Sequence, residues 1–372
     1  MRIACDARPL LGQRTGVSVW LEGLVRGLAA ATDWDFVLCL PRPISGVGVD
    51  DLAGRAQTSS PPVRMPGTLW LHTLASPLVN DDADVYLGTL GVLPRRLRMP
   101  AALVVHDLTP RTRPHRHTLA NRFCFNAYIE ESVERADALV CDSKATAAVL
   151  GAIWPRHGRR AVVVPPGIDE HFSPAADGES PEPVRLRFAA GRSFIVQLGT
   201  LEPRKGVATL LGAHGVLLRR RPETPDLVLA GKAGWGGNWL EAALVEHPDR
   251  DRVHVVGYVT RDEARALLRH AEAVAVSSEE EGFGLPLAEA LACGAACVAS
   301  DDPALVEVAG GAALHFVRGD RDALVAALER VLTPDVRDVL RDAARTRAPH
   351  FAWGRSLESW RALLQGLADA RG

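Results

Sequence analysis

The fold is decided by residues 273–299, AVAVSSEEEGFGLPLAEALACGAACVA. The apolar run 273–276 predicts a short buried strand, and the glycine-rich loop after it leads into a helix over 285–293. A second apolar run, at 296–299, predicts another strand. A strand, a helix and a strand that follow one another without a hairpin turn are typical of a βαβ unit in a parallel sheet.

The same alternation extends over the whole chain. In the first half we expect strands near 3–6, 36–40, 85–87, 103–106, 138–141 and 162–164, with helices over 18–31 and 121–136. In the second half we expect strands at 194–198, 227–230, 253–256, 273–276 and 296–299, with helices over 207–220, 262–271, 285–293, 321–332 and 356–368. The pattern predicts an α/β fold of two doubly wound, Rossmann-like domains, whose ligands bind beyond the carboxyl ends of the strands.

A break divides the two halves. Residues 165–183 are rich in Pro, Gly, Asp and Glu, which suits an interdomain linker, and residues 41–67 have the excess of Pro, Gly and Ser expected of a loop. A chain of 372 residues also exceeds what one core usually serves. We expect an N-terminal domain over 1–175, a C-terminal domain over 176–352 that faces it across a cleft, and a final helix within 353–372.

The composition restricts the partners and the compartment. With 47% hydrophobic and 24% charged residues and a net charge of −2, the chain is not built to bind nucleic acid through bulk charge. It contains no run of 18 apolar residues and no signal-peptide pattern. Its six cysteines form no CxxC pair, which favours free thiols in a reducing compartment. We expect a cytoplasmic protein, with peripheral contact at the inner membrane as an alternative.

The loop 279–284 and the helix after it form a candidate anion site. Gly282 and Gly284 allow a tight turn close to a ligand, and the helix start presents amides to it. Glu281 precedes the helix and Glu289 lies inside it, so the two carboxylates could hold two sets of sugar hydroxyls around a diphosphate. The alternative stays open, because such loops are common and an early glutamate also complements the helix dipole.

A second candidate is GTLEPRKG, residues 199–206, which follows the strand at 194–198. Arg204 offers a planar fork to phosphate oxygens, and Lys205 adds a mobile point charge at the mouth of the next helix. The two cations would neutralise a diphosphate and stabilise its charge as it leaves. A solvated charge pair that caps a turn is the alternative.

In the first half, His106 and Asp107 come at the end of the strand at 103–106. His106 is a candidate ligand of a substrate hydroxyl, with Asp107 as the carboxylate that would orient its ring. A histidine satisfied by a neighbouring carbonyl is the alternative. Gly12 and Gly16 bracket a polar loop before the first helix, and this loop is not GxGxxG, which argues against a standard dinucleotide fold.

Three further features indicate a function less specifically. A basic stretch would suit an acidic or phosphorylated acceptor or an anionic membrane, although solvated loop charges are the simpler interpretation; it contains Arg111, Arg113, His115, Arg116, His117 and Arg122. Asp82 and Asp84 form a DxD, which we interpret as turn chemistry, and we predict no metal site. Trp235, in GKAGWGG at 231–237, is a candidate lid or acceptor contact, or a partly buried loop residue.

The segment EEEGFGLPLAEALACG resembles the Glu-x7-Glu signature of glycosyltransferase family 4, a retaining family with the two-domain GT-B fold. The resemblance extends through CVASDDPALVEVAGGAAL, through GTLEPRKG and, in the first half, through the His-Asp-Leu-Thr-Pro stretch at 106–110. GIDEHFSP at 167–174 is similar to the family's linker entry. FAWGRSLESW at 351–360 is similar to the start of its last helix, which crosses back to the first domain. The loop at 6–20 lacks the family's Gly-Gly pair.

The resemblance implies roles for individual residues. Glu281 would contact the donor sugar, Glu289 the ribose, and His106 the sugar under the diphosphate, while Gly257–Val259 would border the base. The catalytic set it implies is His106, Glu281, Arg204 and Lys205. The donor-binding set is Gly16, Arg204, Lys205, Gly257, Tyr258, Glu281, Gly282, Phe283, Gly284, Leu285 and Glu289. It implies no cofactor besides the donor itself.

The sequence therefore predicts a retaining, metal-independent glycosyltransferase. It would move a hexose, with mannose favoured, from a GDP- or UDP-sugar to a hydroxyl of a glycan, lipid-linked or small-molecule acceptor, in cell-envelope glycan or secondary-metabolite synthesis. A Rossmann oxidoreductase is disfavoured, because GxGxxG with an acidic residue about 20 positions later is missing. A relative that binds nucleotide sugars without catalysis, or couples a non-sugar group, remains the alternative.

Overall fold

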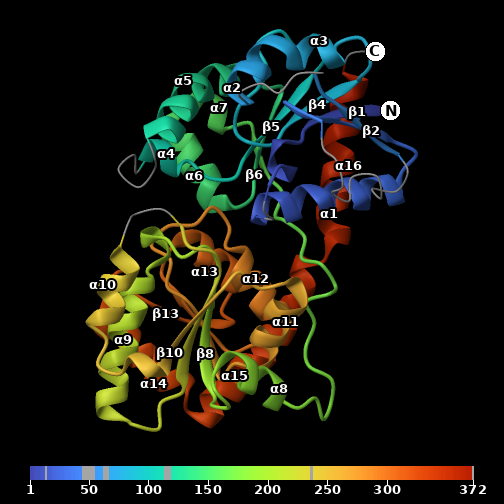
Figure 1. Cartoon of the computed structure of the whole chain (residues 1–372). Helices are drawn as coiled ribbons and strands as arrows, with labels where there is room; N and C mark the ends of the chain where they lie inside the picture. The colour runs from blue at the N-terminus through green and yellow to red at the C-terminus, as the bar shows by residue number, and fades with distance from the viewer. Residues whose placement is uncertain (13–14, 44–54, 62–66, 113–118, 235–237, 371–372) are drawn as a thin grey trace. The chain divides into compact units, whose positions relative to one another are not determined.

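In a computed structural model, the chain folds into two compact units (Figure 1). One comprises Met1–Gly167 with Trp353–Gly372, and the other comprises Ile168–Ala352. The structure describes residues 1–12, 15–43, 55–61, 67–112, 119–234 and 238–370, and only the backbone of residues 68 and 119–124.

The first unit is built on a parallel sheet whose seven described strands are mostly buried apolar runs. Their order across the sheet is β3 (Ala56–Ser59), β2 (Asp35–Cys39), β1 (Arg2–Asp6), β4 (Val85–Gly88), β5 (Ala101–Val105), β6 (Ala138–Cys141) and β7 (Ala161–Val163). Ile3 pairs with Phe36 on one side and with Val85 on the other, so the order reverses between β1 and β4. Such a reversal is the point where doubly wound sheets bind ligands.

Helices cover both faces of this sheet with separate apolar clusters. They are α1 (Gly16–Ala31), α2 (Gly67–Trp70), α3 (Ser76–Val79), α4 (Thr109–Thr112), α5 (Leu119–Arg135), α6 (Lys144–Ile153), α7 (Pro155–Gly158) and α16 (Trp353–Asp369). Between α2 and α3 lies a π-helical turn, Leu71–Ala75.

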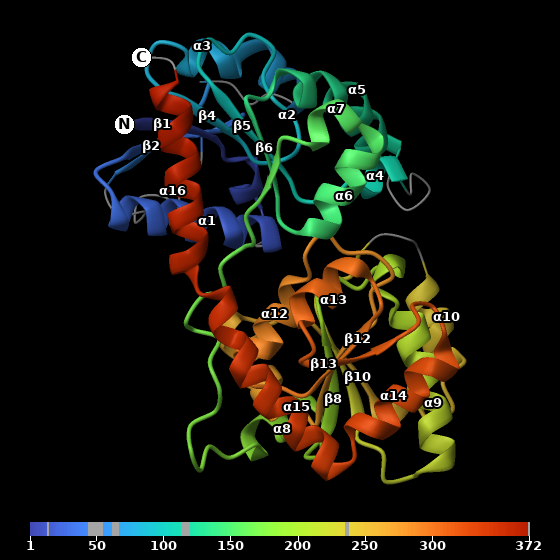
Figure 2. The ribbon, with the colours of Figure 1, turned by 180° about the vertical axis from the view of Figure 1, so that it is seen from behind.

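The C-terminal helix α16 belongs to the first unit and packs beside α1 (Figures 1 and 2). Two glycines of α1 make room for it: a Cβ on Gly23 would lie 2.2 Å from the Trp353 ring, and one on Gly27 would lie 2.6 Å from Leu357. Trp360 and Leu364 of α16 are completely buried in the same core as α1. The spacing of four residues between the glycines therefore creates a groove along one face of α1.

The second unit is built on a parallel sheet with six described strands. Their order is β10 (Val253–Gly257), β9 (Asp226–Ala230), β8 (Phe194–Leu198), β11 (Ala273–Val276), β12 (Cys297–Ser300) and β13 (Ala313–Phe316). Numbered within the unit, this is the order 3-2-1-4-5-6 of nucleotide-binding Rossmann sheets. The helices are α8 (Glu182–Phe188), α9 (Val207–Arg220), α10 (Trp239–Val245), α11 (Arg261–His270), α12 (Leu285–Ala292), α13 (Pro303–Ala309), α14 (Arg321–Val331) and α15 (Pro334–Arg347).

The expected α/β fold of two doubly wound units is confirmed, with local corrections. The loop expected at 41–67 contains the edge strand β3. Its sequence lacks the alternation of apolar and polar residues typical of a strand, and it is largely exposed. The linker expected at 165–183 is partly core: Ile168 and Phe172 are buried in the second unit, and Ile168 pairs with Ala352 where the chain leaves that unit. The last residues of the expected linker begin α8.

Candidate functional site

Three charged residues predicted from the second half, Arg204, Lys205 and Glu281, meet where the strand order of its sheet reverses. Arg204 and Lys205 follow β8 in a short 3-10 turn, and Glu281 follows the neighbouring strand β11. Lys205 Nζ lies 2.5 Å from Glu281 Oε1, and Arg204 Nη1 lies 3.7 Å from Glu281 Oε2. Arg204 also forms a 2.6 Å ion pair with Glu202.

Glu281 is ionised in this cluster although its carboxyl is buried. Burial alone would raise its pKa, but the charges of Lys205 and Arg204 more than offset burial and hold the pKa below the ordinary value. Ser278 Oγ donates a further hydrogen bond of 2.7 Å to Glu281 Oε1. The site therefore contains two cations paired with two carboxylates, Glu281 and Glu202, and it holds these cations at the strand ends, where an anionic ligand would meet them.

Buried polar contacts hold the two loops together. Gln197 Nε2 donates to the Lys205 carbonyl at 3.0 Å, and Ser277 Oγ lies 2.7 Å from Gln197 Oε1. Gly206 has φ of +66°, and a Cβ there would lie 2.0 Å from the Ser277 carbonyl oxygen. Only glycine allows so close an approach of the two strand ends.

The helix α12 begins beside this cluster. Gly284 is its N-cap with φ of +101°, and a Cβ there would lie 2.4 Å from Leu305. Phe283 is buried against Phe351, with ring centroids 6.4 Å apart. Within the described part of the chain, the amides of Gly284 and Leu285 donate to no acceptor, and Gly282 precedes them in the same loop. Amides at a helix start with no protein acceptor are ready to bind phosphate oxygens.

Glu289 lies one turn into α12 and has a different environment from Glu281. Burial raises its pKa to about 7, while Arg261 opposes that rise and Asp169 adds to it. Arg261 Nη2 is itself engaged by Asp169 Oδ2 at 2.8 Å. Among the described residues no group donates a hydrogen bond to the side-chain carboxyl of Glu289, so this carboxyl is available to a hydroxyl-bearing ligand.

Gly257 and Tyr258 lie at the same edge of the sheet, at the end of β10. Gly257 has φ of +73°, and its carbonyl accepts a 2.7 Å hydrogen bond from the amide of Gly231, at the end of β9. The Tyr258 side chain is 54% exposed, which leaves its ring face available for stacking.

Two residues of this edge were not predicted from the sequence. Asp302 caps α13 through the amides of Ala304 and Leu305, and Arg318 Nη1 lies 3.3 Å from both Asp302 Oδ2 and the Glu279 carbonyl. Burial raises the pKa of Asp302 to about 6, and the charge of Glu281 adds to the rise. Arg318 thus joins the glutamate loop to the next strand end. Its position after β13 could not be deduced because that strand was not expected.

In the first unit, His106 follows β5 and is held by a residue from the next strand. His106 Nδ1 lies 2.6 Å from Asp142 Oδ2, and both side chains are largely buried. Burial lowers the pKa of His106, but Asp142 outweighs it and the pKa is raised. The expectation that Asp107 orients the ring is wrong: Asp107 Oδ1 instead accepts hydrogen bonds from the amide and hydroxyl of Thr109.

The remaining expected features of the first unit have mixed outcomes. Gly16 is the first residue of α1 rather than part of the loop, because Thr15 caps the helix with Ser18. The DxD is turn chemistry: the Asp82 amide donates to the Val79 carbonyl, and Asp84 accepts from the Arg2 amide. Most of the basic stretch (residues 113–118 and the side chain of residue 122) and Trp235 lie outside the described residues.

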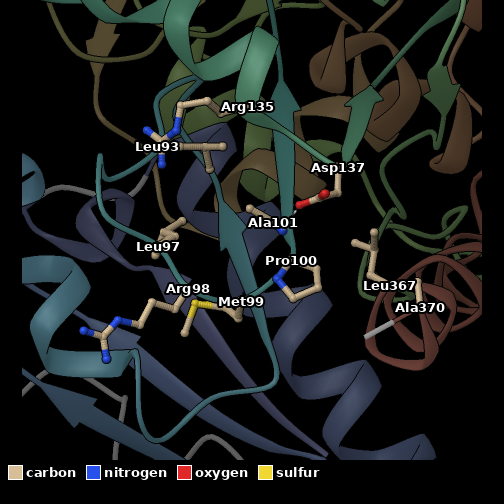
Figure 3. Close-up of a pocket in the computed structure, with 10 residues that line it drawn as sticks. All are labelled: Leu93, Leu97, Arg98, Met99, Pro100, Ala101, Arg135, Asp137, Leu367 and Ala370. Atoms are coloured by element: carbon tan, nitrogen blue, oxygen red, sulfur yellow. Dashed lines mark hydrogen bonds between the residues drawn. The ribbon is translucent and has the colours of Figure 1, made fainter. Parts of the chain in front are cut away.

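A cavity of about 460 Å³ lies elsewhere in the first unit (Figure 3). It opens at the amino ends of β5 and β6, between Ala101, Asp137 and the end of α16. His106 lies at the opposite, carboxyl ends of these strands.

No described helix is both long and apolar enough to cross a membrane.

The two sheet orders define a doubly wound α/β protein of the Rossmann type. Residues 181–347 match the model of the family Glycosyl transferases group 1. The chain is 28% identical over 271 residues to O-antigen chain mannosyltransferase B of Escherichia coli, covering 72% of this chain and 71% of that protein. It is 32% identical over 265 residues to D-inositol 3-phosphate glycosyltransferase of Kineococcus radiotolerans, covering 65% of this chain and 61% of that protein.

Solved structures with little sequence identity share the fold over nearly their whole length. Sucrose-phosphate synthase from Thermosynechococcus elongatus aligns with a TM-score of 0.78 at 20% identity, covering 100% of each chain. Anabaena HepE in complex with UDP and glucose aligns with a TM-score of 0.77 at 16% identity, covering 98% of this chain and 100% of that one. The match over residues 181–347 and these relatives indicate a glycosyltransferase, and the solved structures confirm the expected GT-B fold.

Proposed function

We propose that the chain is a retaining, metal-independent hexosyltransferase that moves mannose from a nucleotide-diphosphate sugar to a hydroxyl of a cell-envelope glycan. One observation carries this proposal: Arg204 and Lys205 pair with Glu281 at the point where the strand order of the second sheet reverses. The similarity to an O-antigen chain mannosyltransferase supports the choice of sugar and acceptor.

In this proposal the diphosphate is bound by Arg204, Lys205 and the amides at the start of α12. Glu281 and, from the first unit, His106 hold the donor sugar, Glu289 binds the ribose hydroxyls, and Gly257 and Tyr258 border the base. The free carboxyl of Glu289 supports its role, because a ribose diol would supply the missing donors.

The bond from the sugar to the diphosphate breaks as the acceptor oxygen forms a bond to the same carbon on the same face. The acceptor proton passes to the leaving phosphate, whose negative charge is taken up by the two cations and the helix amides. This sequence of events needs no protein nucleophile and retains the configuration. It needs no metal, since Arg204 and Lys205 supply the positive charge.

The first experiment is thermal unfolding with saturating GDP, UDP, dTDP and ADP in turn, with EDTA present. A nucleotide at about 100 times its Kd adds about 2.7 kcal/mol of stability, a readily measured shift in melting temperature. We expect one nucleotide, GDP for a mannose donor, to shift wild type but not Arg204→Ala. A shift that survives in Arg204→Ala would contradict the diphosphate site.

Turnover with the matching donor is then measured over a panel of glycan and inositol phosphate acceptors, and the anomeric configuration of the product is read by NMR. An inverted product would refute the retaining mechanism. Binding without turnover on any acceptor would favour a non-catalytic relative. Transfer to inositol phosphate alone would move the acceptor class toward that of the second relative described above.

A further inference from the structure

His106 has one ring nitrogen with a partner and one without. Nδ1 is bound to Asp142 Oδ2 at 2.6 Å, whereas Nε2 is buried and makes no hydrogen bond within the described residues. The Thr89 carbonyl is near enough to favour the protonated ring but does not reach hydrogen-bonding geometry with Nε2. A buried polar nitrogen without a partner is costly, and it indicates a group that becomes satisfied when a ligand binds.

Several elements fix the ring in place. Asp142 follows β6 directly before Ser143, the N-cap of α6, and Thr146 Oγ1 donates to the His106 carbonyl at 3.4 Å. The Trp20 ring of α1 lies edge-on to the imidazole, with centroids 4.9 Å apart. The charged side chains that act on the ring are Asp142 and Asp107, of which only Asp142 bonds it.

We propose that Asp142 is the positioning residue of His106, holding the imidazole through Nδ1 so that Nε2 is directed to an oxygen of the donor sugar. The proposal rests on the proposed function for the identity of that ligand. Asp142 itself touches no substrate: its carboxylate selects the ring orientation and keeps a proton on Nδ1, as carboxylates do for histidines in other enzyme sites.

The chain offers a matched control on the same strand. Asp137 directly precedes β6 and Asp142 directly follows it, and each joins β6 to β5. Asp137 Oδ2 accepts a 2.8 Å hydrogen bond from the Ala101 amide at the edge shown in Figure 3, far from His106 along the strand. Asp137→Asn therefore reports the general cost of losing a carboxylate between these two strands.

The test begins with the free protein. The ring of His106 is titrated by NMR on histidine-labelled wild type, Asp142→Asn and Asp137→Asn, and its resonance is assigned by its loss in His106→Gln. We expect the titration midpoint of His106 to fall in Asp142→Asn and to stay unchanged in Asp137→Asn. An unchanged midpoint in Asp142→Asn would overturn the proposal, and thermal unfolding shows whether each variant is folded.

Donor turnover completes the test. Asp142→Asn should lose about tenfold or more in kcat/KM for the donor, Asp137→Asn should retain wild-type kcat/KM, and the double variant His106→Gln/Asp142→Asn should be no worse than His106→Gln. A loss that persists in full on the His106→Gln background would show that Asp142 does not act through His106. Failure of the proposed function is distinguishable, because the titration requires no substrate: turnover absent in wild type with the midpoint still shifted would refute the donor contact and leave the pair intact.

Discussion

Lys205 and Glu281 are 76 residues apart in the sequence, and their side chains meet at 2.5 Å at the carboxyl ends of two adjacent parallel strands. Both side chains are largely buried, at 13% and 8% exposure. The contact with Lys205 explains how the buried Glu281 carboxylate stays ionised. A bound diphosphate would meet this ion pair.

Lys205→Met should destabilise the protein by about 3 kcal/mol, because it leaves the buried Glu281 carboxylate without its nearest cation. The double variant Lys205→Met/Glu281→Gln should recover part of that loss, since no unpaired charge remains. Urea unfolding of the two single variants and the double variant measures the coupling. Strictly additive losses would show that the two side chains contribute independently.

Gly206→Ala should cost about 1–3 kcal/mol, because φ of +66° is strained for alanine and its Cβ would lie 2.0 Å from the Ser277 carbonyl oxygen. Displacement of that loop should also remove the melting shift caused by nucleotide. The matched control is Gly366→Ala in α16, where a Cβ meets no atom within 4 Å. There we expect a gain of about 0.5–1 kcal/mol. Equal effects at the two sites would contradict the steric explanation.

Glu289 should make stability depend on pH. Its pKa is raised by burial from 4.5 to about 7, so between these values the folded state binds more protons than the unfolded state. Stability from this group is complete below pH 4.5 and is lost as pH rises through about 7. We therefore expect wild type to lose stability relative to Glu289→Gln as the pH rises from 4.5 to 8. Urea unfolding of the two proteins at each pH measures this difference in unfolding free energy. A difference that does not change with pH would show that Glu289 ionises normally.

Gly23→Ala should destabilise the first unit by about 1–3 kcal/mol, although alanine favours helix, because its Cβ would overlap the Trp353 ring. Adding Trp353→Leu to Gly23→Ala should restore part of the loss by opening the groove. Gly151→Ala in α6, where a Cβ has open space, serves as the control. Thermal unfolding compares the four proteins, and a stabilised Gly23→Ala would refute the tight contact of α1 with α16.

The sequence predicted best where strands are buried on both faces. The strands at 194–198 and 273–276 were placed correctly to the residue, because their apolar runs end sharply at polar loops. β3 and β13 were missed: AQTS is a half-exposed edge strand without an apolar run, and ALHF has a histidine inside it. α15 was missed because few of its residues are apolar and only Leu340 and Ala344 are buried.

For the site, reasoning from strand ends brought Arg204, Lys205 and Glu281 to one place, where the structure also has them. Their roles toward a donor stay predictions. Asp142 was not predicted, because Asp107, which follows His106 in the sequence, was chosen as the carboxylate that orients the His106 ring. Asp142 is the carboxylate that lies next to the ring in space. The signal was available in principle: Asp142 follows its own strand directly, and parallel strands bring such positions together once β5 and β6 are known to pair.

The burial of Trp360 and Leu364 in the first unit has a consequence for biosynthesis. On the ribosome, these side chains emerge only after the whole second unit has been synthesised. Until then, the apolar surface of α1 that they cover, including the groove at Gly23 and Gly27, stays uncovered on the nascent polypeptide. The second unit is contiguous in sequence, so all its segments are synthesised before α16. The N-terminal sheet is synthesised first, but its core is completed last, when α16 packs against α1.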